Sequence, residues 1–176
     1  VRAGDPERAN PRPLDECAWH HDVAAHLGAI RDEWRAFADG GGRLPRIEDV
    51  LREDQGNLGA WRVAILWSDG GPTPTASRWF PATVDALRSV PRLRAALWSA
   101  IEPATVLTEH RGPNAGVLRY HLGVDCPPGS TLTIGDRRFP YVDGEGILFD
   151  DTERHAAFNG SAYTRAFEDG RRILFA

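Results

Sequence analysis

Hydrophobic residues recur with a helical period near the N-terminus and in alternation further along the chain. Over residues 15–39 the period of three to four predicts one long amphipathic helix, which the glycines 40–42 end. A second helix is expected over Pro81–Val90, with proline in its first turn. Between them, Trp61–Trp67 predicts a strand, and the Gly-, Pro- and Thr-rich stretch 70–77 predicts a loop.

The second half of the chain alternates between short apolar runs and turn residues. Strands are predicted over residues 95–101, 105–110, 117–124, 130–134, 145–149, 155–159 and 172–176. Many short strands at such close spacing favour a β-sandwich or β-barrel. Residues 1–14 are charged and rich in proline, so we expect a flexible tail followed by a single domain over residues 15–176.

Composition narrows the class of protein. The chain has 176 residues with 21 basic and 25 acidic side chains, and every basic residue is arginine, which is typical of a bacterium with a GC-rich genome. A net charge of −4 disfavours nucleic-acid binding. The two cysteines make neither a disulfide framework nor a zinc motif, and no apolar run is long enough to span a membrane. The polar N-terminus has no signal-peptide pattern, so we expect a cytoplasmic protein.

The predicted strand 117–124 has charged or titratable side chains on a face that is expected to point into the protein. Its alternation places Arg119 and His121 on one face, and both faces also carry apolar residues, as in a central strand. A buried guanidinium is costly unless it meets an anion. Two interpretations stay open: an internal ion pair with an Asp or Glu, or a pocket that binds an anionic ligand.

Two further histidines end or begin predicted strands. His110 closes one strand and His155 opens another, so they can meet only across a folded barrel. Neutral imidazole suits iron, zinc or copper. Asp150 and Asp151 are interpreted as a tight turn rather than as a pair of metal ligands. The tryptophans, Trp61 among them, are interpreted as core or rim packing.

Several runs in the right order make a family recognisable. The run 99–123 contains His110, Arg119 and His121, and the run 144–159 contains Phe149-Asp150-Asp151 and His155. Together with Trp61, Phe80-Pro81 and Leu87–Pro91 upstream, these runs resemble the aspartyl/asparaginyl β-hydroxylase family over about residues 60–176.

The resemblance implies a mainly β fold, the double-stranded β-helix or cupin-like jelly roll, with N-terminal and peripheral helices. It implies Fe(II) and 2-oxoglutarate as cofactors and O2 as co-substrate. His110 and His155 would be the iron ligands, and Ser99, Arg119 and His121 would hold 2-oxoglutarate. Where most sites of this kind add a carboxylate two residues after the first histidine, the family has glycine, here Gly112.

Two positions depart from the family pattern. The arginine that meets the distal carboxylate of 2-oxoglutarate is expected at Arg172, because it begins the last predicted strand, with Arg165 and Arg171 as alternatives. Two residues before Arg119, Val117 stands where relatives that hydroxylate aspartyl residues have a substrate-binding arginine.

The resemblance therefore predicts an enzyme that hydroxylates a C–H bond of an amino acid, a peptide residue or another small molecule. Hydroxylation of Asp or Asn is the first expectation. The alternatives are a two-histidine halogenase, an acyl-chain hydroxylase and a non-catalytic cupin-like binding domain.

Overall fold

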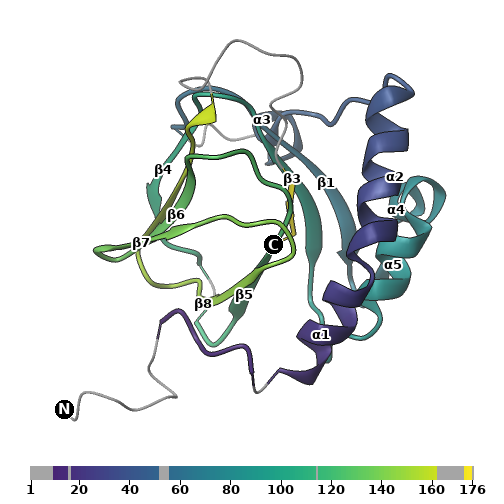
Figure 1. The fold of residues 1–176 in the computed structure, drawn as a ribbon, viewed down its shortest axis with the longest axis horizontal. Helices are drawn as coiled ribbons and strands as arrows, with labels where there is room; N and C mark the ends of the chain where they lie inside the picture. Colours follow the sequence, from purple (N-terminus) through teal and green to yellow (C-terminus); the bar gives the residue numbers. More distant parts are fainter. Residues whose placement is uncertain (1–9, 16, 52–55, 114, 162–172, 176) are drawn as a thin grey trace.

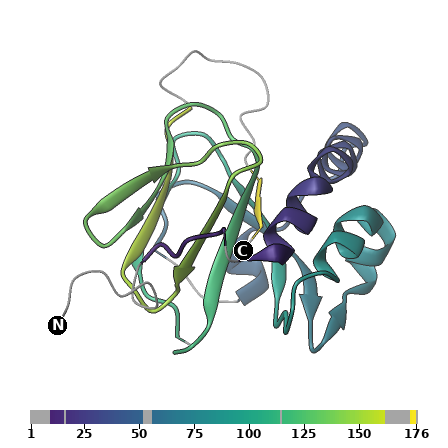
Figure 2. The same cartoon turned by 60° about the horizontal axis from the view of Figure 1, so that its bottom comes forward.

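Two antiparallel β-sheets face each other, and helices cover the outer side of the larger sheet (Figures 1 and 2). The computed structural model describes residues 10–15, 17–51, 56–113, 115–161 and 173–175. The two-sheet arrangement confirms the expected mainly β jelly roll with helices outside it.

The larger sheet has six strands and the smaller sheet four. The larger runs in the order β2 (Gly71–Pro72), β1 (Trp61–Ser68), β3 (Ala96–Ile101), β10 (Ile173–Phe175), β5 (Leu118–Asp125) and β8 (Gly146–Asp150). The smaller runs in the order β4 (Val106–His110), β9 (His155–Asn159), β6 (Ser130–Ile134) and β7 (Arg137–Pro140). The helices are α1 (Ala18–Ala25), α2 (Leu27–Asp39), α3 (Ile47–Leu51), α4 (Pro74–Trp79) and α5 (Pro81–Leu87).

Three local predictions are corrected. The N-terminal helix is interrupted at His26, so it forms α1 and α2. The stretch 70–77 is not a plain loop, because it holds β2 and the start of α4. Thr73 caps α4 by accepting a hydrogen bond from the backbone N–H of Ala76, and Pro74 occupies the first turn. Strand β7 was not predicted, because its polar sequence shows no alternation of apolar and polar residues.

The segment before α1 lies against the larger sheet. The backbone N–H of Arg12 donates to the carbonyl of Leu148 in β8, and the side-chain oxygen of Asn10 accepts from the backbone N–H of Asp150. Residues 10–14 thus pack on the β8 edge, which differs from the flexible tail expected for 1–14. Residues 1–9 lie outside the described residues.

The larger sheet separates two hydrophobic cores. Alternate residues of β3 divide between them: Trp98 packs with the helices, and Ile101 packs between the two sheets. On the helix side, Phe80 stacks against Trp98 and is fully buried. Between the sheets, Phe149 is fully buried as well. No helix in the described part of the chain is long and apolar enough to cross a bilayer.

One carboxylate joins two helices of the outer layer. The residue before α5, Phe80, has no side chain that can cap the helix. Glu33 of α2 supplies the missing acceptor, because its carboxylate accepts hydrogen bonds from the backbone N–H groups of Ala82 and Thr83 and from the Thr83 hydroxyl. The helix N-terminus also attracts negative charge. Glu33 therefore stabilises α5 and holds it against α2.

Replacing Glu33 by alanine is expected to lower the free energy of unfolding by about 1–2 kcal/mol, the usual cost of losing an N-terminal cap. Urea unfolding of the parent and the Glu33→Ala variant measures the difference. Asp32→Ala is the matched control, because Asp32 is exposed on the same helix. Equal losses in the two variants would contradict the capping role.

Candidate active site

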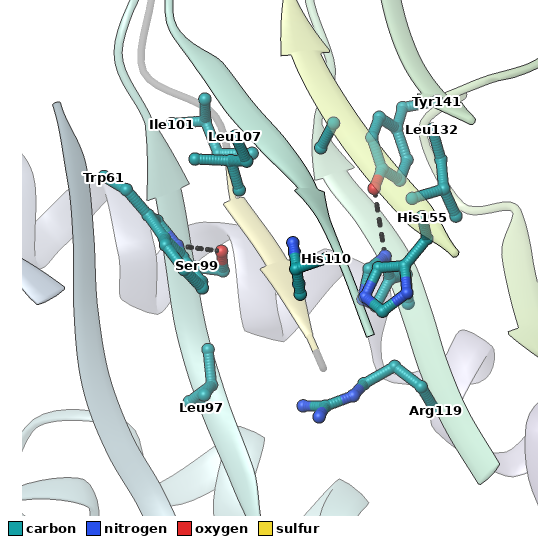
Figure 3. A pocket seen from close by; sticks show the side chains of 12 residues that line it. Trp61, Leu97, Ser99, Ile101, Leu107, His110, Arg119, Leu132, Tyr141 and His155 are labelled. Carbon is teal, nitrogen blue, oxygen red and sulfur yellow. Dashed lines mark hydrogen bonds between the residues drawn. The ribbon is translucent and has the colours of Figure 1, made fainter. Parts of the chain in front are cut away.

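His110 and His155 lie opposite each other on neighbouring strands. They are register partners on β4, the edge strand of the smaller sheet, and β9, its inner neighbour. Their ring centroids are 4.2 Å apart, with the ring planes 61° from parallel. Antiparallel pairing thus brings together two residues that are distant in the chain (Figure 3).

Backbone carbonyls orient both imidazole rings. The Nδ1 atom of His110 is 2.8 Å from the carbonyl oxygen of Thr108, and Nδ1 of His155 is 2.8 Å from that of Glu153. An acceptor at this distance requires Nδ1 to carry the proton, so Nε2 of the neutral ring presents its lone pair. Burial lowers the pKa of His155, and His110 beside it acts in the same direction, which favours the neutral ring. The arrangement is that of a metal-ligating histidine pair.

The histidine pair opens into a cavity of about 530 Å³, counting the space at its mouth. Both sheets line it, through Trp61, Leu97, Ser99, Ile101, Leu107, His110, Arg119, His121, Leu132, Tyr141, His155 and Ala157. Figure 3 shows Ile101 and Tyr141 at one end, Leu97 and Arg119 at the other, and the histidines between. The first end is closed by buried side chains, whereas Leu97 and Arg119 are partly exposed.

Ser99 presents a hydroxyl inside this cavity. Its side chain is 4% exposed, and its Oγ accepts a hydrogen bond of 2.8 Å from Nε1 of Trp61. An indole N–H can only donate, so the contact with Trp61 does not use the hydroxyl proton of Ser99. Trp61 was interpreted from the sequence as packing, and the structure gives it this positioning contact as well.

Arg119 meets a carboxylate of the chain itself. Its Nε donates to Oδ1 of Asp151 at 3.0 Å and its Nη2 donates to Oδ2 at 2.8 Å, a bidentate pair. Asp151 is buried, and its side chain is 3% exposed. The internal ion pair, one of the two interpretations of Arg119, is therefore formed. Three of the five guanidinium N–H groups are not used by it.

His121 is held from the closed end of the cavity. Its Nδ1 lies 3.0 Å from the hydroxyl of Tyr141, and its ring contacts Phe149 edge-on. Burial lowers the pKa of His121 well below its usual range, and the charge of Arg119 lowers it further. The ring is therefore neutral, and the Tyr141 hydroxyl fixes its orientation.

Gly112 has no side chain because a carboxylate occupies the space. A β-carbon on Gly112 would lie 1.7 Å from Oδ2 of Asp151. The backbone N–H of Gly112 also donates to the backbone carbonyl of Asp151 at 2.7 Å. Asp151 therefore places its carboxylate where a side chain two residues after His110 would stand, and its Oδ1 is 3.7 Å from Nε2 of His155.

The structure brings five of the predicted site residues around one cavity: Ser99, His110, Arg119, His121 and His155. The sixth, Arg172, lies outside the described residues, as do Arg165 and Arg171, and the strand β10 begins directly after Arg172. Sequence reasoning missed Tyr141 and the role of Asp151. The aspartate pair was interpreted as a turn, which holds for Asp150, whose carboxylate accepts from the backbone and hydroxyl of Thr152. The one signal in the sequence that pointed to a carboxylate from elsewhere was the glycine at 112, where a side chain would overlap Asp151.

Gly112→Ala is expected to destabilise the protein by about 1–3 kcal/mol, because the new methyl group overlaps the Asp151 carboxylate. In the double variant Gly112→Ala/Asp151→Ala the overlap is gone, so its loss is expected to be smaller than the sum of the single losses. Urea unfolding of all three variants measures this coupling. Gly28→Ala is the control, because a β-carbon there meets no atom within 4 Å; strictly additive effects would contradict the steric argument.

Two curated proteins are similar to this chain in sequence. The chain is 30% identical over 163 residues to the ornithine lipid ester-linked acyl 2-hydroxylase of Rhizobium tropici, covering 89% of this chain and 58% of that protein. It is 36% identical over 124 residues to the human aspartate beta-hydroxylase domain-containing protein 2, covering 66% of this chain and 32% of that protein. It thus spans about three fifths of one relative and a third of the other.

A solved structure shares the fold. The Pseudomonas putida prolyl-4-hydroxylase superposes with a TM-score of 0.54 at 12% identity, covering 86% of this chain and 84% of that one. The family model that matches residues 24–167 is described as aspartyl/asparaginyl beta-hydroxylase. Most of the chain, including every described residue of the histidine pair and its cavity, lies within that match, and the chain belongs to the aspartyl/asparaginyl β-hydroxylase family.

Proposed function

We propose that the protein is an Fe(II)- and 2-oxoglutarate-dependent hydroxylase that converts a C–H bond of its substrate into C–OH. The observation that carries the proposal is the pair His110 and His155, which line one cavity and whose Nδ1 atoms both bond to backbone carbonyls. Family membership supports the same reaction class.

The donors present suit iron. His110 and His155 would hold the ion through Nε2, and imidazole nitrogen is a common ligand of non-haem Fe(II). In the described part of the chain no group of three or more His, Cys, Asp or Glu side chains is placed to share one ion. Two protein ligands would leave several coordination positions for 2-oxoglutarate and O2, which this chemistry requires. Arg119 holds Asp151 beside His155, so Asp151 would adjust the charge near the ion without being one of its two protein ligands.

The polar groups that line the cavity suit 2-oxoglutarate. Ser99 would donate its hydroxyl proton to a carboxylate, and the neutral ring of His121 would offer a further polar contact. Arg119 would turn the N–H groups that Asp151 does not use toward the same ligand. A dianionic co-substrate in a buried site needs such charge-assisted contacts. Arg172 would supply the distal cation at the start of β10.

Iron, 2-oxoglutarate and O2 together supply the oxidising power: one oxygen atom of O2 enters the substrate as hydroxyl and the other enters succinate, with release of CO2. The chain's own residues orient the reactants and keep water out. Trp61 fixes Ser99, Tyr141 fixes His121, and Asp151 fixes Arg119, so that each polar group is positioned before the ligand arrives. The buried side chains at the closed end exclude water from the co-substrate.

Asp151 favours hydroxylation over halogenation. A halogenase with a two-histidine site needs room for chloride in the place that a carboxylate would otherwise occupy. Here the space beside Gly112 is filled by the Asp151 carboxylate, and an anion beside it would be repelled. A non-catalytic cupin-like domain would bind ligands without release of succinate, so turnover separates that alternative from the proposal.

His110→Ala and His155→Ala are each expected to reduce Fe(II)-dependent succinate release by more than about a hundredfold, since losing even an outer partner of a metal ligand costs tenfold to a hundredfold. Both variants are expected to keep their fold, checked by circular dichroism. His21→Ala serves as control because His21 is exposed on α1. Full activity of either variant at limiting iron would contradict the assignment of that histidine as an iron ligand.

Arg172→Leu is expected to raise the 2-oxoglutarate KM at least about thirtyfold, because a lost charge pair in a buried site costs about 2–5 kcal/mol. Arg165→Leu is expected to be nearly silent, because the sequence places Arg165 well before the last strand and not at its start. Steady-state kinetics with varied 2-oxoglutarate measure both. A large effect of Arg165→Leu or Arg171→Leu with a silent Arg172→Leu would show that the arginine is not the one that begins the last strand.

A further inference from the structure

The two histidines of the pair are held unequally by their surroundings. His155 lies on β9, an inner strand of the smaller sheet, and it is only 7% exposed. His110 is the last residue of β4, the edge strand, and it is exposed. Close packing therefore fixes His155 more firmly than His110. The position of His110 depends more on its backbone and on the hydrogen bonds around it.

The ladder between the two strands is interrupted just before the histidine pair. Leu107 is paired with Ala157, whereas His110 is paired with His155, so β4 has one residue more than β9 over this stretch. Such a bulge re-aims side chains and breaks the regular series of ladder hydrogen bonds. Strand pairing further along β4 therefore does not by itself set where His110 lies.

The end of β4 is tied to the turn between β8 and β9. Nη1 of Arg111 donates a hydrogen bond of 2.6 Å to the backbone carbonyl of Thr152. The backbone N–H of Gly112 donates a bond of 2.7 Å to the backbone carbonyl of Asp151. Because its donor is a guanidinium, the Arg111 bond is charge-assisted, and such bonds are stronger than neutral ones. Arg111 thus adds a side-chain bond to the backbone contact that follows the strand.

Hydrogen bonds within the turn hold it in one shape. Oδ1 of Asp150 accepts from the backbone N–H of Thr152 at 2.9 Å and from its hydroxyl at 2.7 Å. The backbone N–H of Glu153 donates to the carbonyl of Asp150 at 3.1 Å. The carbonyl of Glu153 is the one that orients the ring of His155. Arg111 therefore ties the other histidine to the turn that orients this one.

We propose that Arg111 is a positioning residue, whose bond to Thr152 sets the spacing of the two imidazole rings and thereby their joint affinity for a metal ion. The inference rests on the proposed function, in which His110 and His155 hold Fe(II). Arg111 acts through the backbone of the turn and not as a ligand, because a guanidinium has no lone pair to offer. Coulomb's law alone predicts the opposite effect, since removing a positive charge near a cation site strengthens binding of the cation. The direction of the change therefore separates positioning from charge.

Co(II) is a suitable probe, because it binds the same ligands as Fe(II) and its visible absorption reports on their geometry. The whole chain is titrated with Co(II) in the absence of 2-oxoglutarate. Arg111→Ala is expected to weaken Co(II) binding about tenfold, the lower end of the cost of losing a group that orients metal ligands, and to alter the absorption. An affinity in Arg111→Ala that equals or exceeds that of the parent overturns the proposal.

Two further variants at the same position test the role of the bond. Arg111→Lys keeps the charge and a donor, so it is expected to bind Co(II) more tightly than Arg111→Ala. Arg111→Gln keeps much of the side chain and is expected to weaken binding relative to the parent, which covers the case that the alanine variant folds poorly. A lysine variant no better than the alanine variant would contradict the proposal.

Arg138→Ala is the matched control, because Arg138 is exposed on β7, at the opposite edge of the smaller sheet from β4. It removes the same charge and is expected to leave Co(II) affinity unchanged. Urea unfolding of the metal-free variants is expected to give the same midpoint for Arg111→Ala and Arg138→Ala, because both arginines are exposed. An equal loss of Co(II) affinity in Arg138→Ala overturns the proposal, as does a loss in Arg111→Ala that only follows a lower midpoint.

Chelation of Fe(II) by 2-oxoglutarate, followed by visible absorption without O2, separates this inference from the function on which it rests. A parent protein that shows no chelation, while Arg111→Ala still weakens Co(II), would refute the proposed function and leave the positioning role standing. Chelation by the parent with an unchanged Co(II) affinity in Arg111→Ala would uphold the function and refute the positioning role. Co(II) binding that His110→Ala leaves intact would refute both. A higher Fe(II) requirement for chelation in Arg111→Ala, with an unchanged 2-oxoglutarate affinity at saturating Fe(II), supports both.

Discussion

The buried carboxylate of Asp151 is the constraint on which the site depends. A carboxylate with 3% of its side chain exposed must meet a positive group, and Arg119 near the start of β5 supplies it. The pair leaves no room for a side chain at Gly112. It also sets the charge beside His155. One ion pair thus joins the start of β5 to the turn between β8 and β9, next to the residues that follow β4.

The larger sheet contributes to two hydrophobic cores, because successive side chains along its strands point to opposite faces. One face of β3 and β5 packs against the helices through Trp98 and Leu122, and the other turns Ser99 and His121 into the cavity. Buried aromatic rings hold the helices to that sheet, and the Glu33 cap holds α5 to α2. A rigid outer layer keeps the strands in register, and register decides which side chains meet at the histidine pair.

The cavity is chemically divided along its length. Its closed end has polar groups, each fixed by a neighbour, as a charged co-substrate requires. Its open end carries Leu97 and the paired Arg119, both partly exposed. Members of one family can differ in substrate through the open end alone, because the closed end is shared chemistry.

Alternation and turn residues are local signals, so the sequence by itself determined the strands, the faces of Arg119 and His121, and the separation of the helices from the barrel. It failed at α4, where Thr73 and Pro74 begin a helix within a composition typical of loops, and at β7, which pairing with β6 alone stabilises. The histidine assignments came from family resemblance. Only the tertiary structure decided that Arg119 meets Asp151 and that Tyr141 holds His121. Those contacts join residues from different strands, and no local pattern encodes a distance across a folded barrel.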